Sequence, residues 1–431
     1  MRSLQLARLL LFAAMTITPA TTTQASLRPS VEPGQIRADR LGILLPKILE
    51  RRGIDLWLVL TREGAVEPVA PTIGLDHIVA RGAFLFSRSA GRYRKLAILA
   101  SYDADSVRGT GLYDQVVSYK SEGIKPHLLS AVQELDPKVI AIDFSRDVPV
   151  ADGLTYGLRR YLEETLGAAY AERMISAQEL IVDLLGTKLP MEIAALRYAI
   201  EATQTVIGEA LTSRIIQPGI TSERDVHRHF EQRGAELGCT IAFSSVVVGP
   251  TRGHSEPTDR VIQRGDLVRV DFGYRYAGYS ADIQRTAYVL REGESAAPAE
   301  IQRFWDTTRR ANLAARAALK VGATGLEVDS AGRRVITEAG YAEYPHGTGH
   351  AIGLQVHDVG AMLGPDWPER YGEAVRFQIG PDQVYAVEPA LYVDYPPMGG
   401  EIHIGLEEDI LVTPDGPQLI GTAQRELILI Q

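Results

Sequence analysis

Cysteine is almost absent from this sequence. Its 431 residues include one cysteine, Cys239. A single thiol excludes a disulfide within the chain and a cluster of thiolates that holds a metal ion. Cys239 follows Gly238 in an apolar stretch, so we expect a buried and unreactive thiol.

An excess of positive charge and long apolar runs are also missing. Lys and Arg number 45 against 54 Asp and Glu, which gives a formal net charge of −9. This balance argues against nucleic acid or an anionic membrane as a partner. The apolar stretch near the start, residues 9–17, is far shorter than the roughly 20 residues that a membrane span needs. We therefore expect no integral membrane segment in the mature chain.

The first 25 residues have the pattern of a secretory signal peptide. Arg2 and Arg8 supply a basic start, the apolar core follows, and Ala25 ends a segment of the kind that a signal peptidase cleaves. The residue directly after this position is Ser26 and not a cysteine, which argues against a lipid-anchored form. We expect a mature chain that begins near Ser26 and is exported, to a periplasm or out of the cell. The alternative is an N-terminus that is disordered and has no leader function.

The length of the chain predicts two domains. The first, residues 30–180, mixes segments of helical and of strand periodicity, which predicts an α/β domain. Expected helices lie at 34–52, 127–135 and 154–166, and expected strands at 55–60, 83–86, 96–100, 116–119 and 139–144. This region has no dense cluster of His, Asp or Glu, so we assign it no chemistry.

The second domain, residues 188–431, begins with two helical segments. The first spans 192–215 and is expected to end before Pro218. The second spans 222–236, with Thr221 or Ser222 as its N-cap. After Ile241 the chain turns into strand segments rich in Val, Ile and Tyr. The polar residues that suggest chemistry all lie in this half.

Two aspartates lie in strand segments on either side of a turn that contains Gly278. Asp271 and Asp282 each stand in an apolar context. A buried carboxylate must be paired with a cation or bound to a metal, because an isolated buried charge is very costly. Either aspartate alone would more often be a turn or cap residue. Two of them on paired strands make a metal site an equal alternative.

Three of the nine histidines fall between residues 346 and 357. His346, His350 and His357 lie in a glycine-rich segment. Glycine allows close approach of the backbone, and imidazole is a metal ligand or proton carrier near neutral pH. A lone histidine here would be read as structural, but three together favour a functional site.

Two glutamates complete the set. Glu388 ends an apolar strand segment before Pro389, and Glu407 opens an acidic trio with Glu408 and Asp409. Taken alone, the trio predicts a solvated strand edge. Taken with the other residues, the pattern offers four carboxylates and one imidazole, which suit two hard or borderline ions such as Mn²⁺, Co²⁺ or Zn²⁺. Four carboxylates roughly neutralise two divalent ions, which in such sites lie about 3.5–4 Å apart.

At these residues the sequence resembles the metallopeptidases with the pita-bread fold: aminopeptidase P, prolidase and methionine aminopeptidase. The resemblance covers residues 188 to about 412, and weakly the N-terminal half. Methionine aminopeptidase usually lacks an N-terminal α/β domain, and creatinase lacks the metal ligands, whereas this chain has both. The resemblance therefore implies an α+β protein: a creatinase-like α/β domain followed by a pita-bread domain, closest to an Xaa-Pro aminopeptidase or prolidase.

The same resemblance implies roles for single residues. Asp271 would chelate one metal, Asp282 and Glu407 would bridge two, and His350 and Glu388 would complete the second metal's ligands. His254, which lies 17 residues before Asp271, matches the family's substrate-side histidine. His346 and His357 match two further histidines that line the active site. A homodimer is also implied.

The implied chemistry is hydrolysis of the N-terminal peptide bond of small peptides by a metal-activated water, with manganese preferred. Glu388 would take the proton of the water and pass it to the leaving nitrogen. His254 and His357 would stabilise the oxyanion or the leaving group. The alternatives are a non-catalytic pita-bread protein that binds peptides, and a metal hydrolase that acts on non-peptide esters.

One position departs from the family, and one requirement has no clear candidate. Aminopeptidase P and prolidase usually carry arginine two residues before the last glutamate, and this chain has Gly405. On a strand, His403 shares the face of Gly405. His403 therefore either fills part of the space that the family's arginine would occupy or is an ordinary exposed histidine. A dipeptidase needs a cation for the free carboxylate of its substrate, and Arg370 or Arg376 could supply it or be ordinary surface arginines.

Overall fold

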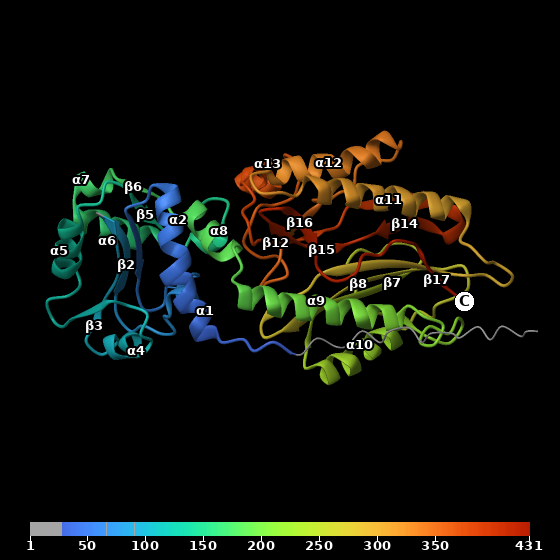
Figure 1. The fold of residues 1–431 in the computed structure, drawn as a ribbon, viewed down its shortest axis with the longest axis horizontal. Coiled ribbons are helices and arrows are strands. Elements are labelled where there is room, and N and C mark those ends of the chain that lie inside the picture. Colours follow the sequence, from blue (N-terminus) through green and yellow to red (C-terminus); the bar gives the residue numbers. More distant parts are fainter. Residues whose placement is uncertain (1–27, 66, 90) are drawn as a thin grey trace, which may run out of the picture.

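The computed structural model describes residues 28–65, 67–89 and 91–431, so the expected leader lies outside the described residues. The chain forms two units along its longest axis (Figure 1). The N-terminal unit runs from blue to green at the left of the view, and the C-terminal unit occupies the right. Helix α9 (Pro190–Ala210) leads from the first unit into the second.

The N-terminal unit is built on one six-stranded sheet of order β4-β3-β2-β1-β5-β6. Strands β1, β2 and β3 pair antiparallel, and the remaining neighbours pair parallel. The strands are β1 (Leu56–Thr61), β2 (Gly82–Ser89), β3 (Arg92–Ala100), β4 (Gln115–Tyr119), β5 (Ile140–Ile142) and β6 (Met174–Ser176). The five expected strands are confirmed, whereas β6, only three residues long, was missed.

Helices cover both faces of this sheet, which explains why every residue of β1 is buried. Trp57 and Val59 pack on one side with α2, and Leu56 and Leu58 pack on the other with α5 and α6. The helical segments are α1 (Pro33–Asp39), η1 (Arg40–Leu44), α2 (Leu45–Arg52), α3 (Ala70–Ile73), α4 (Ala104–Gly109), α5 (Lys125–Leu135), η2 (Pro149–Ala151), α6 (Tyr156–Leu166), α7 (Ala168–Ala171) and α8 (Gln178–Gly186). The expected helix at 34–52 is thus interrupted by a π-helical turn at η1.

The C-terminal unit contains three sheets. The first has the order β17-β10-β8-β7 with β9 beside β8, the second β11-β12-β15-β16, and the third is the pair β13-β14. Their strands are β7 (Thr240–Val248), β8 (Leu267–Tyr276), β9 (Tyr279–Ser280), β10 (Ile283–Val289), β11 (Gly349–Ala351), β12 (Val384–Val387), β13 (Ala390–Tyr395), β14 (Gly400–Gly405), β15 (Glu408–Thr413), β16 (Gly416–Leu419) and β17 (Ile428–Ile430). Figure 1 shows these strands between two layers of helices.

The helices of this unit lie outside the strands. Helices α9 and α10 (Glu223–Leu237) lie below β7 and β8, while α11 (Ala299–Ala318) and α12 (Gly325–Glu338) lie above the other sheets (Figure 1). The expected end of α9 was wrong, because the helix ends at Ala210 and Leu211 already leaves the helical conformation with ψ 46°. Ser222 is the N-cap of α10, and its hydroxyl accepts a hydrogen bond from the amide of Asp225.

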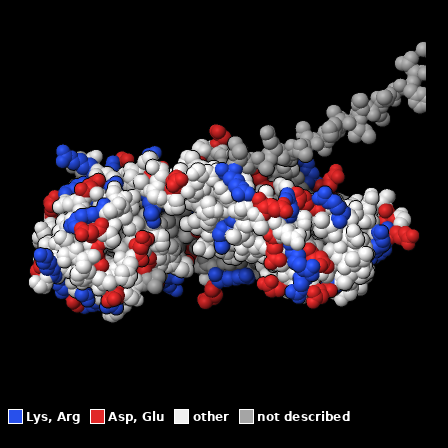
Figure 2. Space-filling view, turned by 90° about the horizontal axis from the view of Figure 1, so that it is seen from below, with Lys and Arg blue, Asp and Glu red and all other residues white. Residues whose placement is uncertain are grey.

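The structure also bears on the single cysteine, on membrane-spanning helices and on the distribution of surface charge. Cys239 is buried, as expected, and burial raises the pKa of its thiol to about 11, which favours the unreactive thiol form. Among the residues described, no helix combines the length and the apolar composition that a membrane crossing requires. On the face drawn in Figure 2, acidic and basic side chains are interspersed over both units.

Candidate metal centre and active site

A β-hairpin carries the two aspartates. Asp271 lies in the middle of β8, and Asp282 immediately precedes β10, which pairs antiparallel with β8. The connecting turn has positive φ at both Ala277 (49°) and Gly278 (93°), as a tight two-residue hairpin requires. Both aspartates are buried, with 3% and 4% of their surface exposed. The reading of these residues as simple turn or cap residues is therefore wrong.

A second sheet carries the other three residues of the predicted ligand set. His350 lies in β11, Glu388 directly follows β12, and Glu407 directly precedes β15. These strands are neighbours, because β12 pairs with both β11 and β15. The amide of Glu407 donates to the carbonyl of Gln284 at 3.2 Å and so joins this sheet to the hairpin.

The two sheets bring the ligand atoms together. One atom each of Asp282, His350 and Glu407 lie within 4.8 Å of one another. Nε2 of His350 is 3.4 Å from Oδ2 of Asp282 and 3.7 Å from Oε1 of Glu388. Asp271 lies beside this group, with its Oδ2 facing Arg269 and Gln284.

The electrostatics of these carboxyl groups indicate that a cation belongs among them. Burial raises the pKa of Glu388 to about 8, His350 opposes this shift, and Asp282 adds to it. The pKa values of Asp282 and Glu407 are raised well above their ordinary range by burial and by neighbouring carboxylates. In the described part of the chain, Arg269 is the one arginine or lysine that forms an ion pair with any of these groups. Carboxylate oxygens and one imidazole therefore form a donor set that fits divalent cations.

The acidic trio is not a solvated edge. Glu407, Glu408 and Asp409 are each at most 1% exposed, so that interpretation was wrong. Glu408 pairs with Arg285 at 2.9 Å, and Oδ2 of Asp409 accepts a hydrogen bond from the amide of Asp282 at 3.1 Å. Asp409 thus holds the backbone of Asp282, a predicted ligand, through a contact that sequence reasoning missed.

The three other histidines lie around the same centre. The ring of His357 lies 4.0 Å from that of His350 between centroids, and this neighbour together with burial lowers the pKa of His357. Burial lowers the pKa of His346 to about 4. His254 is exposed, and its proximity contributes to the lowered pKa of both His346 and His357. These placements fit side chains that border the centre, and their catalytic roles stay predictions.

The space at Gly405 is filled by a residue that we did not expect. A Cβ atom at Gly405 would collide with the side-chain amide oxygen of Gln284, and would lie 3.0 Å from Nε2 of His403. His403 is 8% exposed and stacks on Tyr392, so the exposed alternative was wrong. Gln284 is the main occupant, and His403 lies beside it.

The two arginines considered for the substrate carboxylate are exposed and already have partners. Arg370 donates to the carbonyl of Pro345 at 2.7 Å, and Arg376 pairs with Asp366 at 2.9 Å. Both positions therefore look like the surface arginines of the alternative interpretation.

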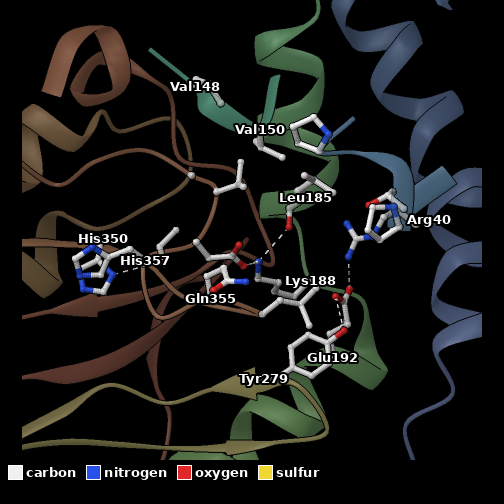
Figure 3. Close-up of a pocket in the computed structure, with 18 of the residues that line it drawn as sticks. Arg40, Val148, Val150, Leu185, Lys188, Glu192, Tyr279, His350, Gln355 and His357 are labelled. Atoms are coloured by element: carbon white, nitrogen blue, oxygen red, sulfur yellow. Dashed lines mark hydrogen bonds and ion pairs between the residues drawn. The ribbon is translucent and has the colours of Figure 1, made fainter. Parts of the chain in front are cut away.

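A cavity of about 720 Å³ adjoins the centre and extends to the N-terminal unit. Figure 3 shows His350 and His357 at the left of the view, Val148 and Val150 at the top, and Arg40 beside Glu192 at the right. The two deeply buried cations in its wall are paired, Arg40 with Glu192 and Lys188 with Asp358. Its charged groups are thus largely neutralised, and most of the remaining lining is apolar.

The fold and this site define a protein with a group of buried carboxylates, suited to a divalent cation, where two sheets meet. Residues 194–414 match the family model of metallopeptidase family M24, and the chain belongs to that family. It is a metallopeptidase.

Known relatives agree with this assignment. The chain is 30% identical over 307 residues to an Xaa-Pro dipeptidase of Pyrococcus horikoshii, which covers 69% of this chain and 79% of that protein. The solved structure of an Xaa-Pro dipeptidase from Bacillus anthracis superposes with a TM-score of 0.62 at 26% identity, covering 92% of this chain and 99% of the other. Dipeptidase PepE from Mycobacterium ulcerans, at 21% identity, shares the fold with a TM-score of 0.66 over 93% of this chain and 99% of its own. The predicted α+β architecture is confirmed.

Proposed function

We propose that this metallopeptidase is exported, holds two divalent cations with manganese preferred, and hydrolyses the bond before proline in small peptides. The observation that carries the proposal is the convergence of Asp271, Asp282, Glu388, Glu407 and His350, four carboxylates and one imidazole with a single paired arginine. The names of the relatives, Xaa-Pro dipeptidase above all, support the preference for proline.

The residues of the chain have separable tasks in this proposal. Bound divalent cations would supply positive charge that acidifies water and polarises the carbonyl of the substrate. Glu388, whose carboxylate lies 3.7 Å from Nε2 of His350, accepts the proton of the attacking water and delivers it to the leaving nitrogen. His254 and His357 bind the oxygen that becomes negative in the transition state, and His346 borders the same space.

A rate panel tests the reaction. The purified protein is stripped of metal, reloaded with Mn²⁺, and assayed on Ala-Pro, Ala-Pro-Ala and Ala-Ala-Ala. Cleavage of either proline peptide, lost with chelator and restored with Mn²⁺, supports the proposal. Equal cleavage of Ala-Ala-Ala would contradict the preference for proline. The comparison of Ala-Pro with Ala-Pro-Ala separates a dipeptidase from an aminopeptidase.

Export and dimer formation are tested separately. The leader pattern at 1–25 supports export, so N-terminal sequencing of the protein from the cell envelope or medium should begin near Ser26. An intact Met1 in that fraction would contradict it. The family resemblance supports a homodimer, which light scattering of the purified protein should detect as twice the mass of one chain.

A further inference from the structure

Two donors hold one side of the predicted metal centre. Oδ2 of Asp271 accepts hydrogen bonds from Nη1 of Arg269 at 3.3 Å and from Nε2 of Gln284 at 3.0 Å. All three residues are 3% exposed. Among the described residues, Asp271 alone of the four predicted carboxylate ligands has a guanidinium or a side-chain amide as a donor.

The strands explain how these side chains meet. Arg269 and Asp271 are two residues apart in β8, so their side chains share one face of the strand. Gln284 lies directly opposite Asp271 in β10. A buried arginine inside a strand needs compensating contacts, because a buried charge without partners is costly.

Arg269 also contacts the segment that carries His254. Its Nη2 donates to the carbonyl of Gly253 at 2.5 Å, one residue before His254. The planar guanidinium therefore joins a predicted metal ligand to the backbone of a predicted substrate-side residue. A lysine has a single ammonium group and lacks this rigid fork.

Gly405 belongs to the same arrangement. A Cβ atom there would collide with the amide oxygen of Gln284, so any larger residue displaces Gln284 from the position in which it donates to Asp271. The absence of a side chain at 405 is thus a condition for the contact between Gln284 and Asp271.

We propose that Arg269 and Gln284 are positioning residues that fix the orientation of Asp271. Arg269 also links Asp271 to the segment that carries His254. Gly405 leaves the space that Gln284 needs to reach Asp271. This inference rests on the proposed metal-dependent function. The positive charge of Arg269 by itself would repel a cation and weaken its binding. If the protein binds Mn²⁺ more tightly with Arg269 than without it, the arginine must act by orienting Asp271.

The first experiment compares Arg269→Met and Arg269→Lys, with Arg275→Met as the control. Arg275 lies on the same strand and donates to Ser280, away from the predicted ligands. Calorimetric titration of apo-protein with Mn²⁺, kcat, KM and melting temperature are measured for each variant. We expect Arg269→Met to weaken Mn²⁺ binding by about 10–100-fold, the usual scale for a partner of a metal ligand, and Arg275→Met to leave it unchanged.

The lysine variant separates the two contacts of Arg269. A lysine that faces Asp271 should recover much of the Mn²⁺ affinity, while kcat at saturating Mn²⁺ stays low because the bond to Gly253 is lost. Unchanged or tighter Mn²⁺ binding in Arg269→Met, with a lower melting temperature alone, would show that Arg269 is merely structural. A wild-type protein that binds no Mn²⁺ would instead refute the proposed function.

The second experiment is a cycle of Gly405→Ala, Gln284→Ala and the double variant, measured by Mn²⁺ titration. Gly405→Ala should weaken binding about as much as Gln284→Ala, since both remove the same donor from Asp271. In the double variant the collision is relieved, so adding Gly405→Ala to Gln284→Ala should cost no further affinity. Independent, multiplying losses in the double variant would overturn the role given to Gly405.

Discussion

At the scale of the residue, the side chains of Asp282 and Glu407 lie in a position that favours neutral carboxyl groups unless a cation is present. Burial and neighbouring carboxylates raise the pKa of both groups. A bound cation reverses this preference, because opposite charge stabilises the ionised form. Asp282 lies next to β10 in one sheet, and Glu407 lies next to β15 in another. Both residues therefore lie at the junction of two sheets, where each can approach predicted metal ligands from either sheet.

We expect Asp282→Ala to lose metal and activity together. The variant removes one of the three atoms that lie within 4.8 Å of one another, and leaves bound cations with less negative charge between them. Elemental analysis and turnover are measured beside Asp394→Ala, which removes an exposed carboxylate from β13 of the same unit. Two ions per chain in Asp282→Ala would contradict its assignment as a bridging ligand.

The histidines should divide into a ligand and groups that act on substrate. His350 faces the carboxylates through Nε2, so His350→Ala should lower metal occupancy as well as rate. His254→Ala and His357→Ala should keep the metal and lower kcat by about 10²–10⁴-fold, the scale of one acid–base or oxyanion group. Metal content, melting temperature and kcat are measured on the three variants. Full turnover of His254→Ala with its metal retained would remove that residue from the mechanism.

At the scale of the element, the loop before α3 carries a buried acid whose effect on folding can be measured. Burial and the neighbouring Glu67 raise the pKa of Asp143, which follows β5, and no cation pairs with either acid among the described residues. Trp57 donates to Asp143 at 2.6 Å. Burial raises the pKa of Glu67 from its ordinary 4.5 to about 7, despite a backbone hydrogen bond from Val69.

The raised pKa of Glu67 predicts a pH dependence of stability with a definite sign. The folded state binds a proton that the unfolded state releases between pH 4.5 and about 7, so stability falls as pH rises through this range and is constant above it. Glu67→Gln mimics the neutral acid and should stabilise the protein at pH 8 by up to about 3 kcal/mol, with little effect at pH 4.5. Urea unfolding at both pH values tests this, with the exposed Glu63→Gln as control. An equal effect of Glu67→Gln at both pH values would contradict it.

At the scale of the whole molecule, the cavity beside His350 and His357 is lined by both units. The N-terminal unit contributes Pro68, Pro71, Val148 and Val150, although none of its residues belongs to the predicted ligand set. A pocket that is mostly apolar, with its deeply buried charges paired, suits an apolar side chain better than a free carboxylate. We therefore expect the N-terminal unit to affect substrate choice through packing.

Narrowing this cavity should discriminate between substrates by size. Val150 lines the cavity, so the Val150→Trp substitution fills part of its volume. It should lower kcat/KM for Leu-Pro and Phe-Pro by at least about tenfold more than for Gly-Pro. Val79→Trp is the control, since Val79 is 39% exposed in the same unit and does not line the cavity. A uniform loss on all three substrates would show that the cavity does not receive the side chain of the first residue.

The sequence by itself determined the features that depend on short separations along the chain. Alternation and turn chemistry predicted the hairpin of Asp271 and Asp282, and spacing within one glycine-rich segment predicted that His346, His350 and His357 act together. Local periodicity predicted helices at 34–52 and 192–215, and in the structure the first is interrupted at η1 and the second ends early, at Ala210. Local periodicity reports the face on which a side chain lies, because it follows from backbone geometry alone.

Only the tertiary structure decided which faces meet. The packing of two sheets buried the trio at Glu407, which a local reading left in solvent, and gave Asp409 its contact with Asp282. It also filled the space at Gly405 with Gln284, a residue with no signal of its own in the sequence. These contacts depend on long-range packing. The cost of burying a charge depends on the groups that pair with it, and these groups come from distant parts of the chain that local periodicity cannot predict.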